Sequence, residues 1–269
     1  MNTSTDSSTL QDRGLVPASG GGEALSRGGG RGLSEPQAAR PGAESYGKTL
    51  NRVETYFDKT ATKTWERLTS DAPVSGVRAT VRAGRDKMRE TMLSRLPEDL
   101  CGARVLDAGC GAGQVTEILA SRGADVIAID ISPSLVDIAR KRVPEHLHPK
   151  VGFGSGDMFD PSLGTFDYVI AMDSMIYYEA PDLGQKLATL SQRVNEAVVF
   201  TVAPRTAFLM TFWGVGKLFP RADRSPVMIP HSPVRVAEET RKAGGTGTLT
   251  EIKRINSGFY ISTCLEYRL

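Results

Sequence analysis

Residues 104–113 read RVLDAGCGAG, and this stretch decides the expected fold. A short apolar run ends in Asp107, and three glycines follow at alternate positions: Gly109, Gly111 and Gly113. Glycines at a strand-to-helix turn let the backbone approach a ligand where a Cβ atom would collide. The G-x-G-x-G spacing is tighter than the G-x-G-x-x-G of dinucleotide-binding proteins. The stretch therefore predicts a strand, a ligand-binding turn and a helix in succession.

Composition and charge limit the class of protein. The chain has 269 residues, 40% of them hydrophobic, which suffices for one sizeable core. A net charge of +2 gives no reason to expect nucleic acid as a partner. Three cysteines without C-x-x-C spacing indicate reduced thiols and no metal site. No apolar run approaches the ~20 residues of a membrane span, and the first residues lack a signal-peptide core. We therefore expect a cytoplasmic protein.

The chain divides into three expected parts. Residues 1–45 are rich in Gly, Ser, Ala and Arg, and should form a disordered tail because they bury too little apolar surface to offset the ordering entropy. Residues 46–97 contain two stretches of helical periodicity, 51–70 and 74–96, which predict a helical cap over the following domain. Residues 98–269 should form one α/β domain.

Within that domain, apolar segments of strand length alternate with helical ones. The expected strands are 105–109, 126–131, 150–157, 168–174 and 197–203. Near-continuous apolar strands are typical of a parallel sheet covered by helices on both faces. The chain ends differently, with two strands, 248–257 and 259–269, that are joined through a Ser-Gly turn signal. The pattern predicts a doubly wound sheet with a different final pair.

An apolar insert, about residues 204–230, follows the fifth expected strand. It carries Phe212 and Trp213, with Lys217 and Arg221 near its end. The apolar residues fit either a core-packed helix or a mobile lid that covers a flat hydrophobic substrate and touches lipid. The two cations fit either solvated surface charge or pairing with substrate carboxylates.

Acidic residues recur at the ends of successive expected strands. Asp130 follows the glycines at about the twenty-residue spacing typical of a carboxylate that binds ribose hydroxyls. Asp157 and Met158 come after the third strand and fit an adenine site, the carboxylate accepting from the amino group and the thioether packing on the ring. Taken singly, such aspartates also fit caps and ordinary β-turns. Their order along the chain favours one ligand site at the carboxyl edge of the sheet.

This order of elements resembles the class I S-adenosylmethionine-dependent methyltransferases. The resemblance implies a Rossmann-like α/β fold, with a mostly parallel seven-stranded sheet, an antiparallel last strand, an N-terminal helical cap and an apolar lid insert. It also implies that the cofactor is S-adenosyl-L-methionine. The cofactor contacts it implies are Asp107, Gly109, Gly111, Gly113, Asp130, Ile131, Asp157, Met158 and Met172.

Longer motifs resemble one family, the magnesium-protoporphyrin O-methyltransferases of chlorophyll and bacteriochlorophyll synthesis. They read YFDKTATKTWERL, VRAGRDKMRETML, MDSMIYYEAPD, APRTAFLMTFWGVGKLFPRADRSP and GFYISTCLEYRL. The resemblance implies methyl transfer to one propionate of a magnesium porphyrin, with magnesium only as part of the substrate. It leaves open contact with magnesium chelatase and peripheral association with the photosynthetic membrane.

The same resemblance implies catalytic residues. Tyr56 matches an N-terminal tyrosine of the family, and Tyr177 stands where the family carries a histidine. A phenol with a pKa near 10 is a poor base but can orient a carboxylate, and a propionic acid with a pKa of about 4.3 is already ionised at neutral pH. His231 lies either near the substrate or simply at a helix start. Arg82 is either a partner for a carboxylate or a surface residue.

Two other functions remain open from the sequence. Methyl transfer to another apolar small molecule is one, because the loop motifs do not select a substrate. A non-catalytic porphyrin carrier is the other, and the intact aspartates Asp107, Asp130 and Asp157 argue against it.

Overall fold

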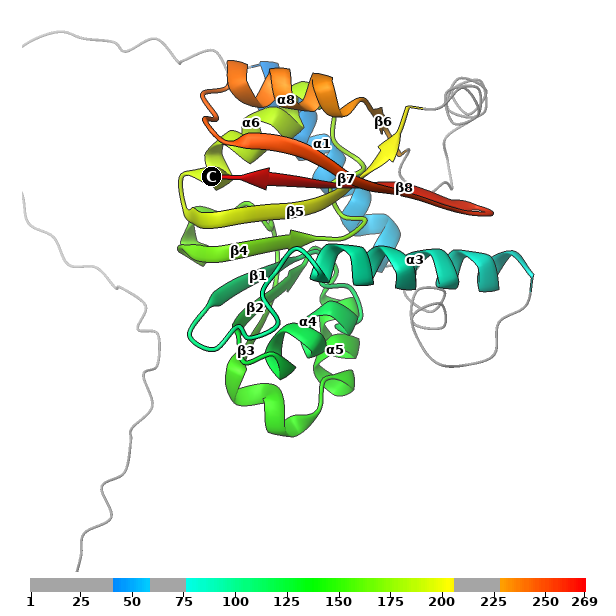
Figure 1. The fold of residues 1–269 in the computed structure, drawn as a ribbon, viewed down its shortest axis with the longest axis vertical. Helices are drawn as coiled ribbons and strands as arrows, with labels where there is room; N and C mark the ends of the chain where they lie inside the picture. The colour runs from blue at the N-terminus through cyan, green and yellow to red at the C-terminus, as the bar shows by residue number, and fades with distance from the viewer. Residues whose placement is uncertain (1–40, 59–75, 206–227) are drawn as a thin grey trace, which may run out of the picture. The chain divides into compact units, whose positions relative to one another are not determined.

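The computed structural model describes residues 41–58, 76–205 and 228–269 (Figure 1). All of them belong to one compact unit, Ala39–Leu269. The expected lid insert and its four substrate-binding candidates lie outside the described residues, except for the ends of the insert, 204–205 and 228–230. The expected tail lies outside them up to residue 40.

The sheet has the expected doubly wound order, β3-β2-β1-β4-β5-β8-β7. Strands β1 to β5 are parallel, β8 pairs antiparallel with β5, and β7 pairs antiparallel with β8. A two-residue strand, β6 (Pro230–His231), pairs with the end of β5. The main strands are β1 (Arg104–Ala108), β2 (Asp125–Asp130), β3 (Val151–Ser155), β4 (Phe166–Ala171), β5 (Val194–Pro204), β7 (Thr248–Ser257) and β8 (Tyr260–Arg268).

Helices cover both faces of the sheet, and each face has its own apolar core. On one face, Met88, Leu119 and Ala139 are buried against the sheet from three helices: α3 (Val77–Leu93), α4 (Gln114–Ser121) and α5 (Pro133–Arg142). On the other face, Leu187 and Val236 are buried from α6 (Ala180–Ser191) and α8 (Pro233–Lys242). Short 3₁₀ helices, Glu145–Lys150 and Pro161–Leu163, connect strands. Burial on both faces explains why the strands are almost continuously apolar.

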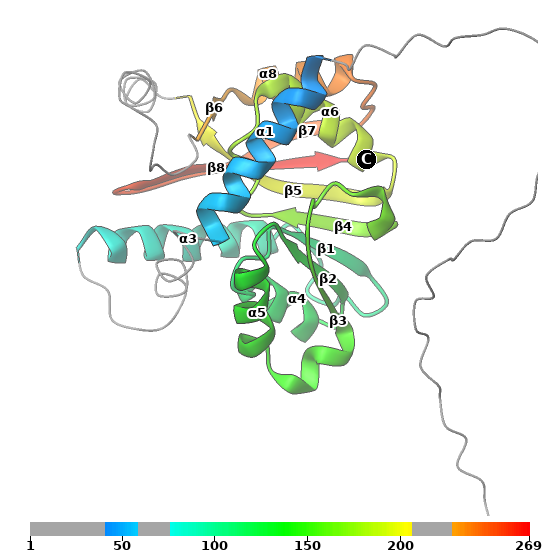
Figure 2. The same ribbon diagram turned by 180° about the vertical axis from the view of Figure 1, so that it is seen from behind.

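The expected helical cap consists of two helices with different places in the fold. Helix α3 confirms the expectation for 74–96 and packs against the β7–β8 hairpin. The contact is close, because a Cβ atom on Gly84 would lie 2.7 Å from the ring of Tyr260. Helix α1 (Pro41–Tyr56) crosses the carboxyl edge of the sheet and contacts α6 (Figure 2).

The boundary of the tail was wrong for residues 41–45, because α1 already begins at Pro41. The ring of Tyr46 stacks on Tyr178 at 5.1 Å, a tertiary contact that gives this part of the helix a partner. The helix expected over 51–70 ends earlier, at Tyr56, with a π-type turn at 57–58. Among the described helices, none has both the length and the apolar character needed to cross a membrane.

Candidate active site

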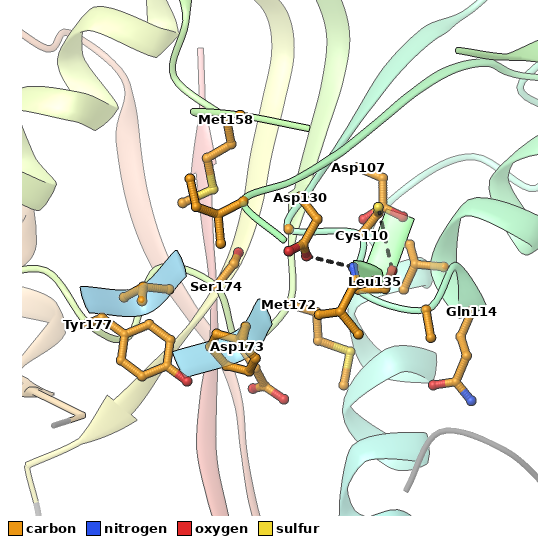
Figure 3. A pocket seen from close by; sticks show the side chains of 18 of the residues that line it. Asp107, Cys110, Gln114, Asp130, Leu135, Met158, Met172, Asp173, Ser174 and Tyr177 are labelled. Carbon is orange, nitrogen blue, oxygen red and sulfur yellow. Dashed lines mark hydrogen bonds between the residues drawn. The ribbon is translucent and has the colours of Figure 1, made fainter. Parts of the chain in front are cut away.

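A pocket of about 960 Å³, counting its open mouth, lies at the carboxyl ends of β1, β2 and β4 (Figure 3). This is the edge at which open α/β sheets bind their ligands. The glycine turn, the ends of β2 and β4, and the helices α1, α3 and α5 all contribute to its lining.

The glycine turn forms one wall of the pocket. Its backbone is fastened to the end of β2, because the N–H groups of Gly109 and Cys110 donate to the carbonyl of Ile129 at 2.8 and 3.0 Å. Gly109 has φ 83° and leaves no room for a side chain, since a Cβ would lie 2.3 Å from the Cβ of Ser174. Gly111 also has a positive φ, but an added Cβ would meet nothing within 4 Å. The backbone at Gly111 is therefore accessible to a ligand.

Asp107 is a buried carboxyl at the end of β1 that lines the pocket. Its Oδ2 accepts a hydrogen bond from the hydroxyl of Thr116 at 2.6 Å. Burial raises the pKa of Asp107 to about 7, and the nearby Asp130 adds to the shift, while the Thr116 bond opposes it. Without a cation beside it, this carboxyl holds its proton close to neutrality. A positively charged ligand group would stabilise the ionised form.

Asp130 joins the glycine turn to the start of α5. One carboxylate oxygen accepts from the N–H of Gly111 at 2.9 Å (Figure 3). The other accepts from the N–H of Ser132 at 3.0 Å. Burial raises the pKa of Asp130, and the backbone donors oppose that effect. Each carboxylate oxygen has a second lone pair, so the group can still accept from ligand hydroxyls.

Asp173, directly after β4, forms a polar centre that the sequence did not indicate. It is the one non-glycine residue with positive φ, 57°, among the described residues. Its carboxylate forms an ion pair with Arg85 of α3 and accepts from the hydroxyl of Tyr260 of β8 at 3.0 Å, while its N–H donates to Thr201 of β5 at 2.8 Å. Aspartate tolerates this backbone region, and three elements hold it there.

Most of the expected cofactor contacts line the pocket. They are Asp107, Gly109, Gly111, Asp130, Ile131, Met158 and Met172. Gly113 does not line it. A Cβ on Gly113 would lie 3.0 Å from the Cβ of Ala139, so this glycine allows the turn to pack closely against α5.

Asp157 was expected to accept from an adenine amino group, and the structure does not support that position. It is absent from the lining, although its neighbours Gly156 and Met158 belong to it. Its carboxylate instead accepts from the hydroxyl of Tyr46 at 2.6 Å and lies 3.7 Å from the ammonium of Lys186. The residue type fitted the motif, but the side chain is oriented toward α1 and α6.

Of the three expected catalytic residues, Tyr177 alone lines the pocket. Burial raises the pKa of its hydroxyl, which therefore stays protonated. Tyr56 is half-buried beside Phe57, and Phe57 lines the pocket instead. His231 is buried outside the lining, with Nε2 2.9 Å from the carbonyl oxygen of Tyr178, and burial lowers its pKa. The geometry gives His231 a structural contact and no place at the pocket.

Arg82 is likewise absent from the lining, and the arginines that α3 contributes are Arg85 and Arg89, three and seven positions further on. Sequence reasoning also missed Leu50, Val53 and Phe57, the apolar residues that α1 adds. Their helical spacing was visible, but nothing in the sequence indicated which element that face would cover.

The sheet order, the glycine turn and the pocket define a class I S-adenosylmethionine-dependent methyltransferase fold. Residues 105–196 match the family model of a methyltransferase domain, and residues 171–268 match that of the magnesium-protoporphyrin IX methyltransferase C-terminus. The magnesium-protoporphyrin O-methyltransferase of Rhodobacter capsulatus is 61% identical over 224 residues, 83% of this chain and 98% of that protein. This chain belongs to the magnesium-protoporphyrin O-methyltransferase family.

More distant relatives share the same fold. The magnesium-protoporphyrin O-methyltransferase of Synechocystis is 28% identical over 80% of this chain and 94% of its own. A crystal structure of magnesium protoporphyrin IX methyltransferase from Synechocystis PCC 6803 with bound SAH superimposes with a TM-score of 0.69 and 27% identity, covering 82% of this chain and 99% of that chain. A second structure of that enzyme contains SAM.

Proposed function

We propose that this protein transfers a methyl group from S-adenosyl-L-methionine to a propionate carboxylate of magnesium-protoporphyrin IX, forming the monomethyl ester in (bacterio)chlorophyll synthesis. The observation that carries the proposal is the 61% identity with the Rhodobacter enzyme over 98% of that enzyme's length. The pocket at the carboxyl edge of the sheet supports it, because seven of the nine expected cofactor contacts line it.

The pocket residues fit this cofactor chemically. Gly111 leaves its backbone open on the ligand side of the turn, and the buried carboxyl of Asp107 suits the ammonium of an amino-acid tail. Asp130 retains lone pairs for ribose hydroxyls, and Met158 and Met172 offer polarisable apolar surface to a base. When bound, S-adenosylmethionine supplies an electrophilic methyl group on its sulfonium.

In this reaction the protein has to position the substrate carboxylate more than it has to transfer a proton. A propionate with a pKa of about 4.3 is ionised at neutral pH, so no strong base is required. Holding the carboxylate oxygen in line with the methyl group can lower the barrier by roughly 7–11 kcal/mol. Leu50, Val53 and Phe57 give this pocket an apolar wall, and the protonated hydroxyl of Tyr177 can donate a hydrogen bond to a substrate carboxylate.

Several narrower expectations stay predictions within this proposal. One is a catalytic role for Tyr56. Another is contact between the substrate and the insert through Phe212, Trp213, Lys217 and Arg221. Contact with magnesium chelatase and peripheral association with the photosynthetic membrane also remain predictions.

A direct assay incubates the full chain with methyl-labelled S-adenosylmethionine and magnesium-protoporphyrin IX. We expect label in a porphyrin monomethyl ester, identified by mass. The magnesium complex of protoporphyrin dimethyl ester is the matched control, since it lacks a carboxylate and should accept no label. Porphyrin binding without methyl transfer would overturn the proposal in favour of a carrier. Transfer to quinone precursors alone would indicate a different substrate class.

A further inference from the structure

The carboxylate of Asp157 belongs to a polar cluster outside the pocket. Its Oδ1 accepts from the hydroxyl of Tyr46 at 2.6 Å and from the N–H of Phe159 at 2.9 Å. The ammonium of Lys186 lies 3.7 Å from its Oδ2. These partners come from α1, from the loop after β3 and from α6, so one carboxylate connects three separate segments.

The ring of Tyr46 also contacts several neighbouring side chains. It stacks on Tyr178 with centroids 5.1 Å apart and meets Phe159 edge-on at 6.3 Å. The ammonium of Lys186 lies 3.7 Å from its ring centroid, within the range of a cation–π interaction. Burial raises the pKa of Tyr46, so the hydroxyl remains a donor at every working pH. The side chain of Tyr46 therefore anchors the N-terminal half of α1 to α6 and to the loop after β3.

The other end of α1 has an anchor of its own. Asp58, directly after the helix, accepts from the hydroxyl of Ser134 at 2.7 Å and from that of Ser132 at 3.4 Å. These serines stand at the start of α5, where a carboxylate is also favoured by the helix dipole. Asp58 and Tyr46 thus hold α1 at both ends of its path along the carboxyl edge of the sheet.

Between the two anchors, α1 presents one apolar face to the pocket. Leu50, Val53 and Phe57 line the pocket, and with Tyr46 they follow the i, i+4, i+7, i+11 spacing of a single helical face. Met158 and Ile131 line the same pocket from the loops after β3 and β2, and Ile131 packs against the apolar cluster that contains Val53. Leu50, Val53 and Phe57 together form an apolar cover of the pocket. The position of this cover depends on the same helix face that carries the Tyr46 anchor.

We infer that Tyr46 and Asp157 are positioning residues for the cofactor: their hydrogen bond fixes α1 across the pocket and so holds its apolar cover over the bound ligand. The inference rests on the proposed function for the identity of that ligand. In this inference Asp157 holds the cover and does not recognise the adenine amino group. Loss of the bond should then weaken binding by speeding ligand dissociation, because the cover opens more often.

The test measures binding of S-adenosylhomocysteine by calorimetry and stopped flow. The variants are Tyr46→Phe, which keeps the ring and removes the hydroxyl, Asp157→Asn, and the double variant. Thr55→Val is the matched control, since that exposed hydroxyl on the same helix donates within α1, to the carbonyl of Asn51 at 2.8 Å. S-inosylhomocysteine, which lacks the adenine amino group, is the second ligand. Thermal unfolding of every variant accompanies the titrations.

We expect each single variant to weaken S-adenosylhomocysteine binding about tenfold, mostly through a faster dissociation rate, as suits one hydrogen bond to a charged acceptor. The dissociation constant of the double variant should be at most about twofold higher than that of either single variant, because both substitutions remove the same bond. Thr55→Val should bind as the wild type does. The preference for the adenine ligand over the inosine ligand should not change in Asp157→Asn.

Three results would overturn the inference. One is a Tyr46→Phe variant with wild-type affinity and dissociation rate, even if it unfolds at a lower temperature. Another is a double variant whose loss of affinity equals the product of the two single losses, which would show that the two residues act independently. The third is loss of the adenine preference in Asp157→Asn alone, which would show that the carboxylate of Asp157 recognises the adenine amino group. A wild-type protein that does not bind S-adenosylhomocysteine at all would instead refute the proposed function.

Discussion

At the scale of single residues, the site depends on carboxyl groups whose surroundings differ although their sequence contexts look alike. Asp107, Asp130 and Asp157 each lie at the carboxyl end of an expected strand. Asp107 and Asp130 line the pocket, whereas Asp157 accepts from Tyr46 outside it. The residue type and its place after a strand could be predicted from the sequence. The direction of the side chain could not, because Tyr46 and Asp157 are 111 positions apart in the chain.

Asp107 gives the site a predictable pH dependence. Its pKa is raised to about 7 by burial, so in the ligand-free protein the carboxyl is largely protonated below that pH. A ligand ammonium binds the carboxylate form, and affinity must therefore rise as the pH increases through 7. We expect the dissociation constant of S-adenosylhomocysteine to fall about tenfold between about pH 6 and about pH 8.

Calorimetric titrations across this pH range check the prediction. Asp107→Asn should bind weakly and with little dependence on pH, because the amide does not titrate. A wild-type affinity that is constant over the range would contradict the assignment of Asp107 to a ligand cation.

At the scale of elements, the ion pair between Arg85 and Asp173 joins α3 to the end of β4, and Tyr260 adds β8 to the same carboxylate. Both charged side chains are largely buried, with 14% and 10% exposure. Removing one partner leaves a buried charge without its counter-ion. We expect Arg85→Gln to lower the free energy of unfolding by about 3 kcal/mol and to weaken cofactor binding as the loop after β4 loses its support.

Denaturant unfolding measures this effect. Lys242→Gln, which breaks an exposed pair with Glu239, is the control and should change stability by less than about 0.5 kcal/mol. Adding Asp173→Asn to Arg85→Gln should recover part of the loss, because asparagine keeps the positive φ and removes the stranded charge. Equal effects of Arg85→Gln and Lys242→Gln would show that the pair does not join these elements.

The elements themselves were predicted to different depths. Strands β1 to β5 and the β7–β8 hairpin follow from apolar runs and turn signals, because burial on two faces leaves a strong local pattern. Helix α1 was placed too late in the chain. Tyr46, near its start, is held by Tyr178 and Asp157, tertiary contacts that have no trace in the local sequence.

At the scale of the whole molecule, the sequence motifs predicted the doubly wound, mostly parallel sheet and the family, and both are confirmed. The edge of the sheet that binds the ligand stays a prediction. The glycine turn and the apolar runs of the later strands account for this success, since both are local patterns. The contacts that Phe57 of the α1 segment and Arg85 of α3 make with the pocket could not be predicted, because the placement of these helices over the sheet depends on tertiary contacts. Cofactor chemistry is thus encoded locally, while the cover over it is a property of the assembled fold.

The most direct test of the central claim is a crystal structure of this protein grown with S-adenosylhomocysteine. The account predicts electron density for the ribose hydroxyls at the carboxylate of Asp130, for the amino group near Asp107 and for the adenine beside Met158, beneath α1. Density for the ligand at any other place in the molecule, or an empty pocket at saturating ligand concentration, would contradict it.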